Sequence, residues 1–207
     1  TLIIPTFSLE RSQELLFELN ALVESKSIPI MPIFLDSPLA IRLTEVFKQF
    51  KNYFNENAQK AMKSDKYLFD FPGLHNTLKS EESKMIGTVP NPKVVIAGSG
   101  MSAGGRVVHH ERHYLPDPNN TLLLTGYQSV GTPGRLIQEG VKVVRITGEN
   151  ITVRAHIVTI SGYSGHKDSD GLLTFVEVAG GSLKKIFVAL GETSSALFMV
   201  QRIRDNL

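Results

Sequence analysis

A histidine in a turn of small residues is the first candidate for chemistry. His166 lies in the segment SGYSGHKD, residues 161–168. The small residues before it are Ser161, Gly162, Ser164 and Gly165. Small neighbours let a substrate approach the imidazole closely, and such a histidine can donate a proton to a leaving oxygen near neutral pH. From these residues alone, His166 is either a catalytic or ligand-binding group or a plain histidine in a turn.

The second candidate is a glycine-rich turn between a strand and a helix, VVIAGSGMSAGG at residues 94–105. Such a turn exposes backbone amides and a helix N terminus to an anion. Gly98, Gly100 and Ala103 also fit the loose dinucleotide-binding pattern. A dinucleotide site needs an acid after the next strand, and that strand runs into Gly126 instead. A phosphate-binding role and a tight strand-to-helix connection are therefore both favoured over dinucleotide binding.

The third candidate is the histidine-rich segment HHERHY, residues 109–114. His109 and His113 are four residues apart and share a helix face, which is half of the geometry of a zinc site. The metalloprotease motif needs a Glu directly after the first of these histidines, and here His110 follows. A solvated basic face with Arg106 and Arg112 is the favoured interpretation, and such a face could help to hold a phosphodiester backbone.

Alternating strands and helices are predicted to position these residues. Strands are expected near residues 1–6, 30–35, 93–98, 121–125 and 142–147. Ser8 is expected to cap a first helix, and Ser37 a second one that starts at Pro38 and runs to Ala61. Residues 64–91 read as a looped excursion with one short helix, and further helices are expected near 104–114 and 132–139. This order predicts an α/β fold with a parallel, helix-covered sheet.

The last third of the chain has a different pattern. Residues 150–160 alternate apolar and polar side chains, which is typical of a strand with one wet face, hairpinned to residues 142–147. Two strand-turn-helix segments follow, SGYSGHKDSDGLLTFVE and KKIFVALGETSSALFMVQRI. We therefore place a domain boundary near residue 140.

Composition excludes several classes of protein. Without cysteine, the 207 residues can form no disulfide framework, Cys-type zinc site or thiol nucleophile, which suits a reducing cytoplasm. The longest apolar runs, VVIAG and IFVAL, are too short to cross a bilayer, so no membrane partner is expected. A net charge of +2 does not by itself indicate nucleic-acid binding. The opening TLIIPTF reads as a buried strand, and we expect the chain to be a fragment that lacks its N-terminal part.

Five segments occur in an order and at distances found in one known family. They are IIPTFSLERSQELL, FLDSPLA, AGSGMSAGGRVVHH, LLLTGYQ and SGYSGH. Together they resemble the C-terminal part of the beta-CASP ribonucleases of the metallo-beta-lactamase superfamily, over nearly the whole chain. The resemblance implies that residues 1–140 are most of the beta-CASP domain, with helices on both sides of its sheet. Residues 141–207 would be the C-terminal α/β portion of the metallo-beta-lactamase fold, the RNA-metabolising motif.

The resemblance implies hydrolysis of RNA phosphodiesters by a hydroxide held between two zinc ions. It places most zinc ligands in the N-terminal half that this chain lacks, so the fragment alone is expected to hold no zinc and to be inactive. His166 matches the family histidine that protonates the leaving group or assists the transition state. Leu190, in VALGE, occupies the position of a family histidine that binds zinc, and leucine cannot bind a metal.

The resemblance also implies a cleft through which a single strand of RNA passes. With the basic face and the small-residue turn included, the candidate RNA- or phosphate-binding residues are Asp36, Ser37, Ser99, Gly100, Met101, Gly104, Gly105, Arg106, His109 and Ser164. The expected partner is single-stranded RNA, and the expected location is the cytoplasm.

Two functions stay open for the intact protein. One is a zinc-dependent ribonuclease. The other, motivated by Leu190, is a non-catalytic RNA-binding pseudo-enzyme or scaffold of the same family. A nucleotide-dependent oxidoreductase is disfavoured because no acid follows Thr125. The helix predicted from Ser195 to Arg204 indicates core packing or a homodimer face, and core packing is favoured.

Overall fold

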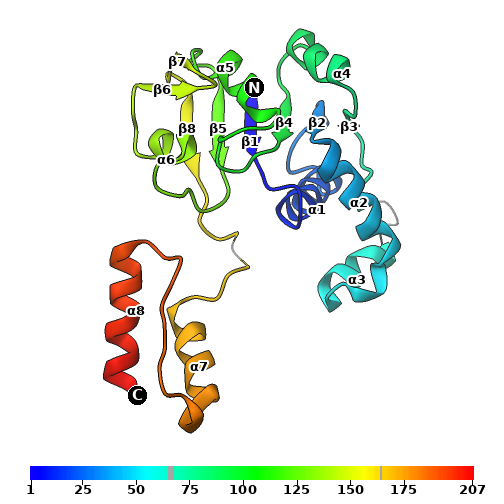
Figure 1. Cartoon of the computed structure of the whole chain (residues 1–207). Helices are drawn as coiled ribbons and strands as arrows, with labels where there is room; N and C mark the ends of the chain where they lie inside the picture. Colours follow the sequence, from blue (N-terminus) through cyan, green and yellow to red (C-terminus); the bar gives the residue numbers. More distant parts are fainter. Residues whose placement is uncertain (65–67, 164) are drawn as a thin grey trace. The chain divides into compact units, whose positions relative to one another are not determined.

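The computed structural model of the chain describes residues 1–64, 68–163 and 165–207. The chain divides into two compact units, Thr1–Tyr163 and Ser164–Leu207 (Figure 1). The first unit contains a six-stranded, all-parallel sheet with the strand order β3-β2-β4-β1-β5-β8. Its strands are β1 (Leu2–Pro5), β2 (Ile33–Asp36), β3 (Leu74–Asn76), β4 (Val94–Ala97), β5 (Thr121–Leu124) and β8 (His156–Thr159).

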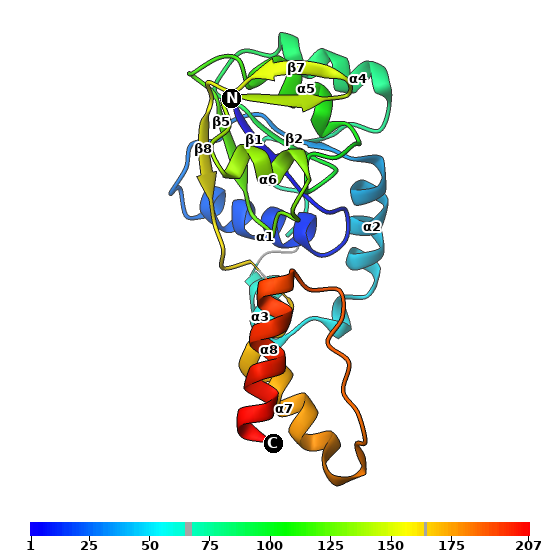
Figure 2. The ribbon, with the colours of Figure 1, turned by 60° about the vertical axis from the view of Figure 1, so that its left-hand side comes forward.

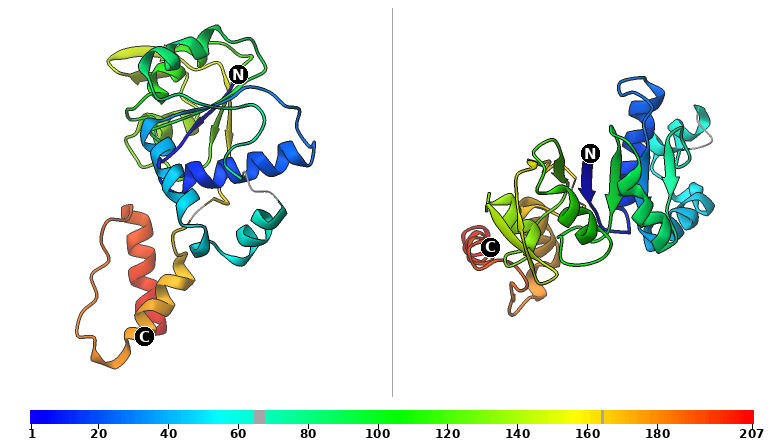
Figure 3. Two further views of the ribbon diagram at one scale, coloured as in Figure 1. Left: turned by 90° about the vertical axis from the view of Figure 1, so that its right-hand side faces the viewer. Right: turned by 90° about the horizontal axis from the view of Figure 1, so that it is seen from above.

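Helices pack on both faces of this sheet, because its strands alternate apolar residues toward two separate cores. On one face, Ile4, Leu35 and Ile96 pack with residues of α1 (Arg11–Glu24) and α2 (Pro38–Gln49). On the other, Ile3, Val95 and Leu122 pack with η2 (Ile86–Thr88), α5 (Val107–Tyr114) and α6 (Pro133–Gln138). Figures 2 and 3 show these layers. The predicted parallel, helix-covered sheet is confirmed.

The remaining elements of the first unit are short. The helix α4 (Ser80–Met85) follows β3, and both lie in the predicted excursion, where only one short helix was expected. A hairpin of β6 (Val143–Ile146) and β7 (Glu149–Thr152) packs Val144, Ile146 and Ile151 into the core on the α5 side. Each fully buried aliphatic side chain contributes about 1.5–3 kcal/mol to folding.

The predicted single helix from Pro38 to Ala61 is wrong. The helix α2 ends at Gln49, the 3-10 turn η1 spans Lys51–Tyr53, and α3 spans Glu56–Ser64. Asn55 Oδ1 accepts a hydrogen bond from the Ala58 amide at 2.9 Å, which caps a new helix. Phe47 and Phe54 remain close, with ring centroids 6.1 Å apart, so the apolar stripe survives although the helix is broken.

The predicted single strand over residues 150–160 is also wrong. It is two strands, β7 and β8, separated where the amides of Arg154 and Ala155 both donate to the carbonyl of Leu115. These bonds redirect the chain, so β8 leaves the hairpin and pairs in parallel with β5.

The second unit contains α7 (Ser169–Ala179), the turn η3 (Gly180–Ser182) and α8 (Thr193–Asn206). Leu173, Met199 and Ile203 are its buried apolar residues. The strand predicted within KKIFVAL is wrong: the described residues there form no strand. The boundary predicted near residue 140 concerns the domains of the family. The two units are defined by packing alone and do not test it, so it stays a prediction. In the part of the chain that the structure describes, no helix is long and apolar enough to cross a membrane.

Candidate nucleic-acid interface

The carboxyl ends of β1 and β4 meet where the order of the sheet reverses. The chain leaves β1 over one face through α1 toward β2, and it leaves β4 over the other face through α5 toward β5. In open α/β sheets, ligands bind in the crevice that such a reversal creates. β1 leads into Ser8, the neighbouring β4 leads into Ser99, and β2, on the other side of β4, leads into Ser37. Three serine-bearing turns therefore share one edge of the sheet.

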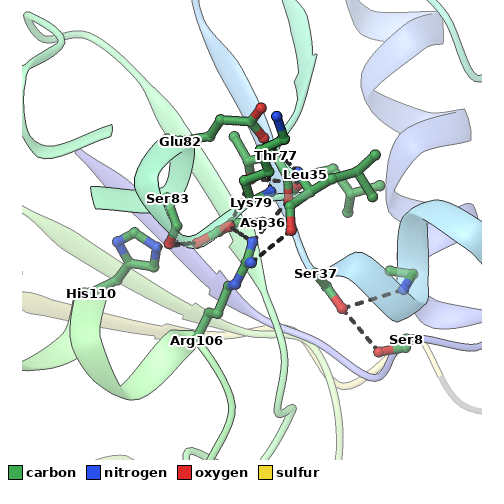
Figure 4. Close-up of polar contacts among 12 residues, drawn as sticks. Ser8, Leu35, Asp36, Ser37, Thr77, Lys79, Glu82, Ser83, Arg106 and His110 are labelled. Carbon is green, nitrogen blue, oxygen red and sulfur yellow. Dashed lines mark hydrogen bonds and ion pairs between the residues drawn. The ribbon is translucent and has the colours of Figure 1, made fainter. Parts of the chain in front are cut away.

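Two of these serines contact each other. The hydroxyls of Ser8 and Ser37 lie 3.1 Å apart, and Ser37 Oγ also accepts from the amide of Ala40, which caps α2 as predicted (Figure 4). The predicted cap at Ser8 is wrong: Glu10 precedes α1, without a side-chain cap, and the Ser8 hydroxyl points to Ser37 instead. Gln13 Nε2 donates to the carbonyl of Ser8 at 3.2 Å, which fixes this turn against α1.

The glycine-rich turn after β4 closes on itself. Gly105 has φ +69, and a Cβ there would lie 2.3 Å from the carbonyl oxygen of Gly98, so only glycine fits. The amide of Ser99 donates to Gly104 and the amide of Val107 donates to Gly98. The amides of Ser102 and Ala103 are engaged as well, by the carbonyl and the Oγ of Ser99. A bound anion would therefore meet the amides of Gly100, Met101 and Gly104 and the hydroxyl proton of Ser99.

Gln128 holds the glycine-rich turn from the strand β5 side. Its Nε2 donates to the carbonyls of Gly100 at 2.9 Å and Gly126 at 3.1 Å. A Cβ on Gly134 would lie 2.0 Å from Gln128 Oε1, so that position must be glycine to admit the side chain. The segment LLLTGYQ thus supports the turn.

Glu111 is buried beneath the same turn. It accepts a hydrogen bond from the Ser102 hydroxyl through Oε1, while Oε2 has no partner among the described residues. Burial raises the pKa of Glu111 to about 7, although the bond from Ser102 lowers it in part. Sequence patterns gave no sign of this group, since a Glu within HHERHY reads as part of a polar helix face.

Asp36, at the end of β2, is the centre of a buried polar network (Figure 4). Its carboxylate has no exposed surface. It accepts four hydrogen bonds, from Thr77 Oγ1 and Ser83 Oγ at 2.6 Å and from Arg106 Nη1 and His110 Nε2 at 2.7 Å. The carboxylate oxygens are thus occupied by donors from the start of α5 and from the segment after β3. Asp36 positions Arg106 and His110, and its direct contact with RNA stays a prediction.

The hydrogen bonds decide the charge of Asp36. Burial alone would raise its pKa, but bonds from His110, Ser83, Thr77 and Arg106 outweigh burial and lower the pKa to about 2. Asp36 is therefore an anion throughout the physiological range.

Arg106 is held by the same network. Besides Asp36, its guanidinium donates at 2.8 Å to the carbonyls of Thr77 and Leu78. These bonds fix the side chain where the glycine-rich turn enters α5. His109 lies on the exposed side of α5, three residues along the helix from Arg106.

The second unit carries His166 in an exposed position shortly before α7, which Asp168 caps by accepting from the amide of Gly171. Ser164 lies outside the described residues. Leu190 is fully exposed. Among the described residues, no group of three or more His, Asp or Glu side chains is arranged to hold a metal ion. The described residues alone therefore do not fit a zinc site, and the roles predicted for His166 and Ser164 stay predictions.

Two family models match the chain. The model described as the Beta-Casp domain matches residues 12–137, and the model described as the Zn-dependent metallo-hydrolase RNA specificity domain matches residues 150–207.

Three curated relatives illustrate the similarity. Ribonuclease TTHA0252 of Thermus thermophilus is 41% identical over 175 residues, which cover 84% of this chain and 40% of that protein. The RNase J-like protein of Methanocaldococcus jannaschii is 31% identical over 205 residues, 99% of this chain and 46% of that protein. The transcription termination factor FttA of Methanosarcina mazei is 28% identical over 211 residues, 99% of this chain and 33% of that protein. The chain thus spans less than half the length of these relatives.

Proposed function

The chain belongs to the beta-CASP family of the metallo-beta-lactamase superfamily, and from this membership we propose that it is the RNA-binding part of a ribonuclease. The observation that carries the proposal is the place at the carboxyl edge of the sheet where the strand order reverses. There Ser8, Ser37 and Ser99 follow three neighbouring strands, beside a glycine-rich turn.

The groups at this edge of the sheet suit a sugar-phosphate backbone. Hydroxyls and free backbone amides donate to phosphate oxygens without reading the base, and they position a strand whatever its sequence. Ser37, Ser99 and the turn residues Gly100, Met101 and Gly104 would make such contacts. Arg106 adds a cation whose orientation Asp36 and two carbonyls fix.

His166 is the residue to which we assign proton donation. Neutral or protonated imidazole can exchange a proton near neutral pH, and in hydrolysis of a phosphodiester the proton would go from the ring nitrogen to the leaving oxygen. The glycine beside it, Gly165, leaves room for the substrate to approach.

Zinc enters the proposal only for the intact protein. The name of the second matching model indicates a zinc-dependent metallo-hydrolase, and two ions are expected from the resemblance. Because the described residues do not fit a zinc site, we assign the ligands to parts of the protein outside these 207 residues. The chain alone is then inactive in hydrolysis but competent to bind RNA.

The test is metal content and cleavage of labelled single-stranded RNA by the intact protein that contains this chain. The proposal expects bound zinc, cleavage that a chelator abolishes, and RNA binding by the 207-residue chain without cleavage. Absence of RNA binding by both proteins would refute it.

One observation favours a second candidate function. Leu190 stands where family members have a zinc-binding histidine, which suits a pseudo-enzyme that binds RNA without cutting it. RNA binding by the intact protein with neither zinc nor cleavage would support this alternative over the ribonuclease.

A further inference from the structure

A groove lies between α4 and α5, on the sheet face opposite α1. It has a volume of about 460 Å³, and Figure 4 shows the end at which Ser83, Arg106 and His110 meet. The α5 wall carries Arg106, His109, His110 and His113. These positions follow the spacing i, i+3, i+4 and i+7, so they form one stripe along the helix.

The opposite wall is small and basic. Ser80, Ser83 and Gly87 leave space there, and Lys84, in the last turn of α4, adds a cation. No described residue that lines the groove carries a carboxylate. The groove therefore presents nitrogen donors from both walls.

Asp36, the buried acid beneath the groove, does not engage all of these donors. Asp36 has no exposed surface and is engaged by Arg106 and His110. The nearby Glu82 is occupied by the amides of Leu78 and Lys79. Three exposed basic side chains of the described lining remain to face solvent: Lys84, His109 and His113.

We propose that this groove binds a phosphate group of the RNA strand, as a second contact beyond the carboxyl edge of the sheet. The inference rests on the proposed function. Lys84, His109 and His113 would donate to the phosphate oxygens, and such charge-assisted bonds are stronger than neutral ones. Gly87 and Ser80 leave room for the attached sugars.

Continuity with the glycine-rich turn favours RNA as the source of the phosphate. Arg106 lines the groove and directly follows Gly105, the last residue of the glycine-rich turn. A strand held at that turn therefore has the groove beside it, and a polymer with a phosphate at every nucleotide can occupy both places. Free phosphate would fill the groove without reaching the turn.

The test compares two double variants of the 207-residue chain. Lys84→Ala with His113→Ala removes groove donors, and Lys142→Ala with His156→Ala removes one exposed lysine and one exposed histidine elsewhere. All four side chains are exposed, so both variants should melt like the unsubstituted chain.

The groove variant should bind labelled single-stranded RNA about tenfold more weakly, as expected for lost charged hydrogen bonds. In a plot of log K against the logarithm of the salt concentration, the slope should be shallower by about 0.7 for each lost contact. The control variant should match the unsubstituted chain.

A second measurement follows the imidazole NMR signals of His109 and His113 during titration with RNA or with inorganic phosphate. Shifts with RNA, together with the weaker binding of the groove variant, support the proposal. Shifts with inorganic phosphate but unchanged RNA affinity of the groove variant overturn it and leave a site for free phosphate. RNA that binds the unsubstituted chain and both variants equally overturns the groove while the proposed function stands. No RNA binding by the unsubstituted chain overturns both.

Discussion

At the scale of single residues, Asp36 links the stability of the fold to the geometry of the interface. Its carboxylate is the common acceptor for Arg106, His110, Thr77 and Ser83, which come from separate parts of the chain. Removal of one partner from a buried charged network is costly, because the remaining charges lose their compensation.

Asp36→Asn should lower the free energy of unfolding by about 3 kcal/mol at neutral pH. The pH dependence should change as well. Because the folded pKa of Asp36, about 2, is below its ordinary value of 3.8, its contribution is fully present above about pH 4. It is lost as pH falls toward 2, and amounts to about 2 kcal/mol. Urea unfolding at a series of pH values measures both effects. Asp70→Asn, at an exposed carboxyl, is the control and should change neither.

Glu111 should give the opposite pH dependence. Its folded pKa is raised from 4.5 to about 7, so the folded protein keeps a proton that the unfolded chain releases. The contribution of Glu111 to the free energy of unfolding is fully present below about pH 4.5 and is lost as pH rises through 7. Glu111→Gln should flatten this part of the stability curve. An unchanged slope between pH 5 and 7 in the variant would show that another group titrates there.

His166 is the residue on which the chemistry of the proposed function depends. In the intact protein, His166→Ala should lower the turnover of single-stranded RNA by about 10²- to 10⁴-fold, which is typical for loss of a general acid. RNA affinity should stay nearly unchanged, because the proton is needed only as the bond breaks. Single-turnover cleavage and a separate binding titration distinguish the two quantities. Equal cleavage rates in the variant would remove His166 from the mechanism.

At the scale of elements, the turn between β4 and α5 depends on its backbone conformation. Gly105→Ala places a Cβ at φ +69, within 2.3 Å of the carbonyl oxygen of Gly98. We expect a loss of more than about 1 kcal/mol in stability and weaker RNA binding, because the turn must open to relieve the contact. Gly181→Ala is the control, since a Cβ there meets nothing within 4 Å and Gly181 is not among the candidate RNA-binding residues. Thermal unfolding and RNA titration of both variants test this. Equal RNA affinity in the two variants would mean that the turn does not contact RNA.

The sequence was sufficient to predict the strands β1, β2, β4 and β5, but it missed the edge strand β3 and the points at which predicted elements break. β1, β2, β4 and β5 are short apolar runs, so a parallel sheet follows from their alternation with helices. The interruption at Asn55 was missed because the apolar residues Phe47 and Phe54 continue the stripe across it. In that place local capping outweighs periodicity.

The candidate site was predictable only in part, because its contacts are distant in sequence. The turns at Ser37 and Ser99 follow strands and are visible as motifs. The partners of Asp36 lie 41, 47, 70 and 74 residues away. No short-range pattern reports such pairs, so Thr77 and Ser83 were not singled out.

At the scale of the whole molecule, the two units differ in how much core they have. The first unit has two cores, one on each face of its sheet, and the strands between them are buried on both sides. Among the described residues of the second unit, only Leu173, Met199 and Ile203 are buried, while Phe175, Phe187 and Phe198 are exposed. A unit of this size has too little core to be stable by itself.

We therefore expect the helices of the second unit to open independently of the sheet in the 207-residue chain. Amide hydrogens of α7 and α8 should exchange at least about 10²-fold faster than those of β1 and β4, because their opening exposes three buried side chains rather than a complete core. Hydrogen exchange resolved by NMR measures this directly. Within the intact protein, burial of the exposed phenylalanines against additional chain should slow exchange in α7 and α8 while β1 and β4 stay as they are. Equal protection of both units in the 207-residue chain would contradict the expectation and show that the second unit draws its stability from the first.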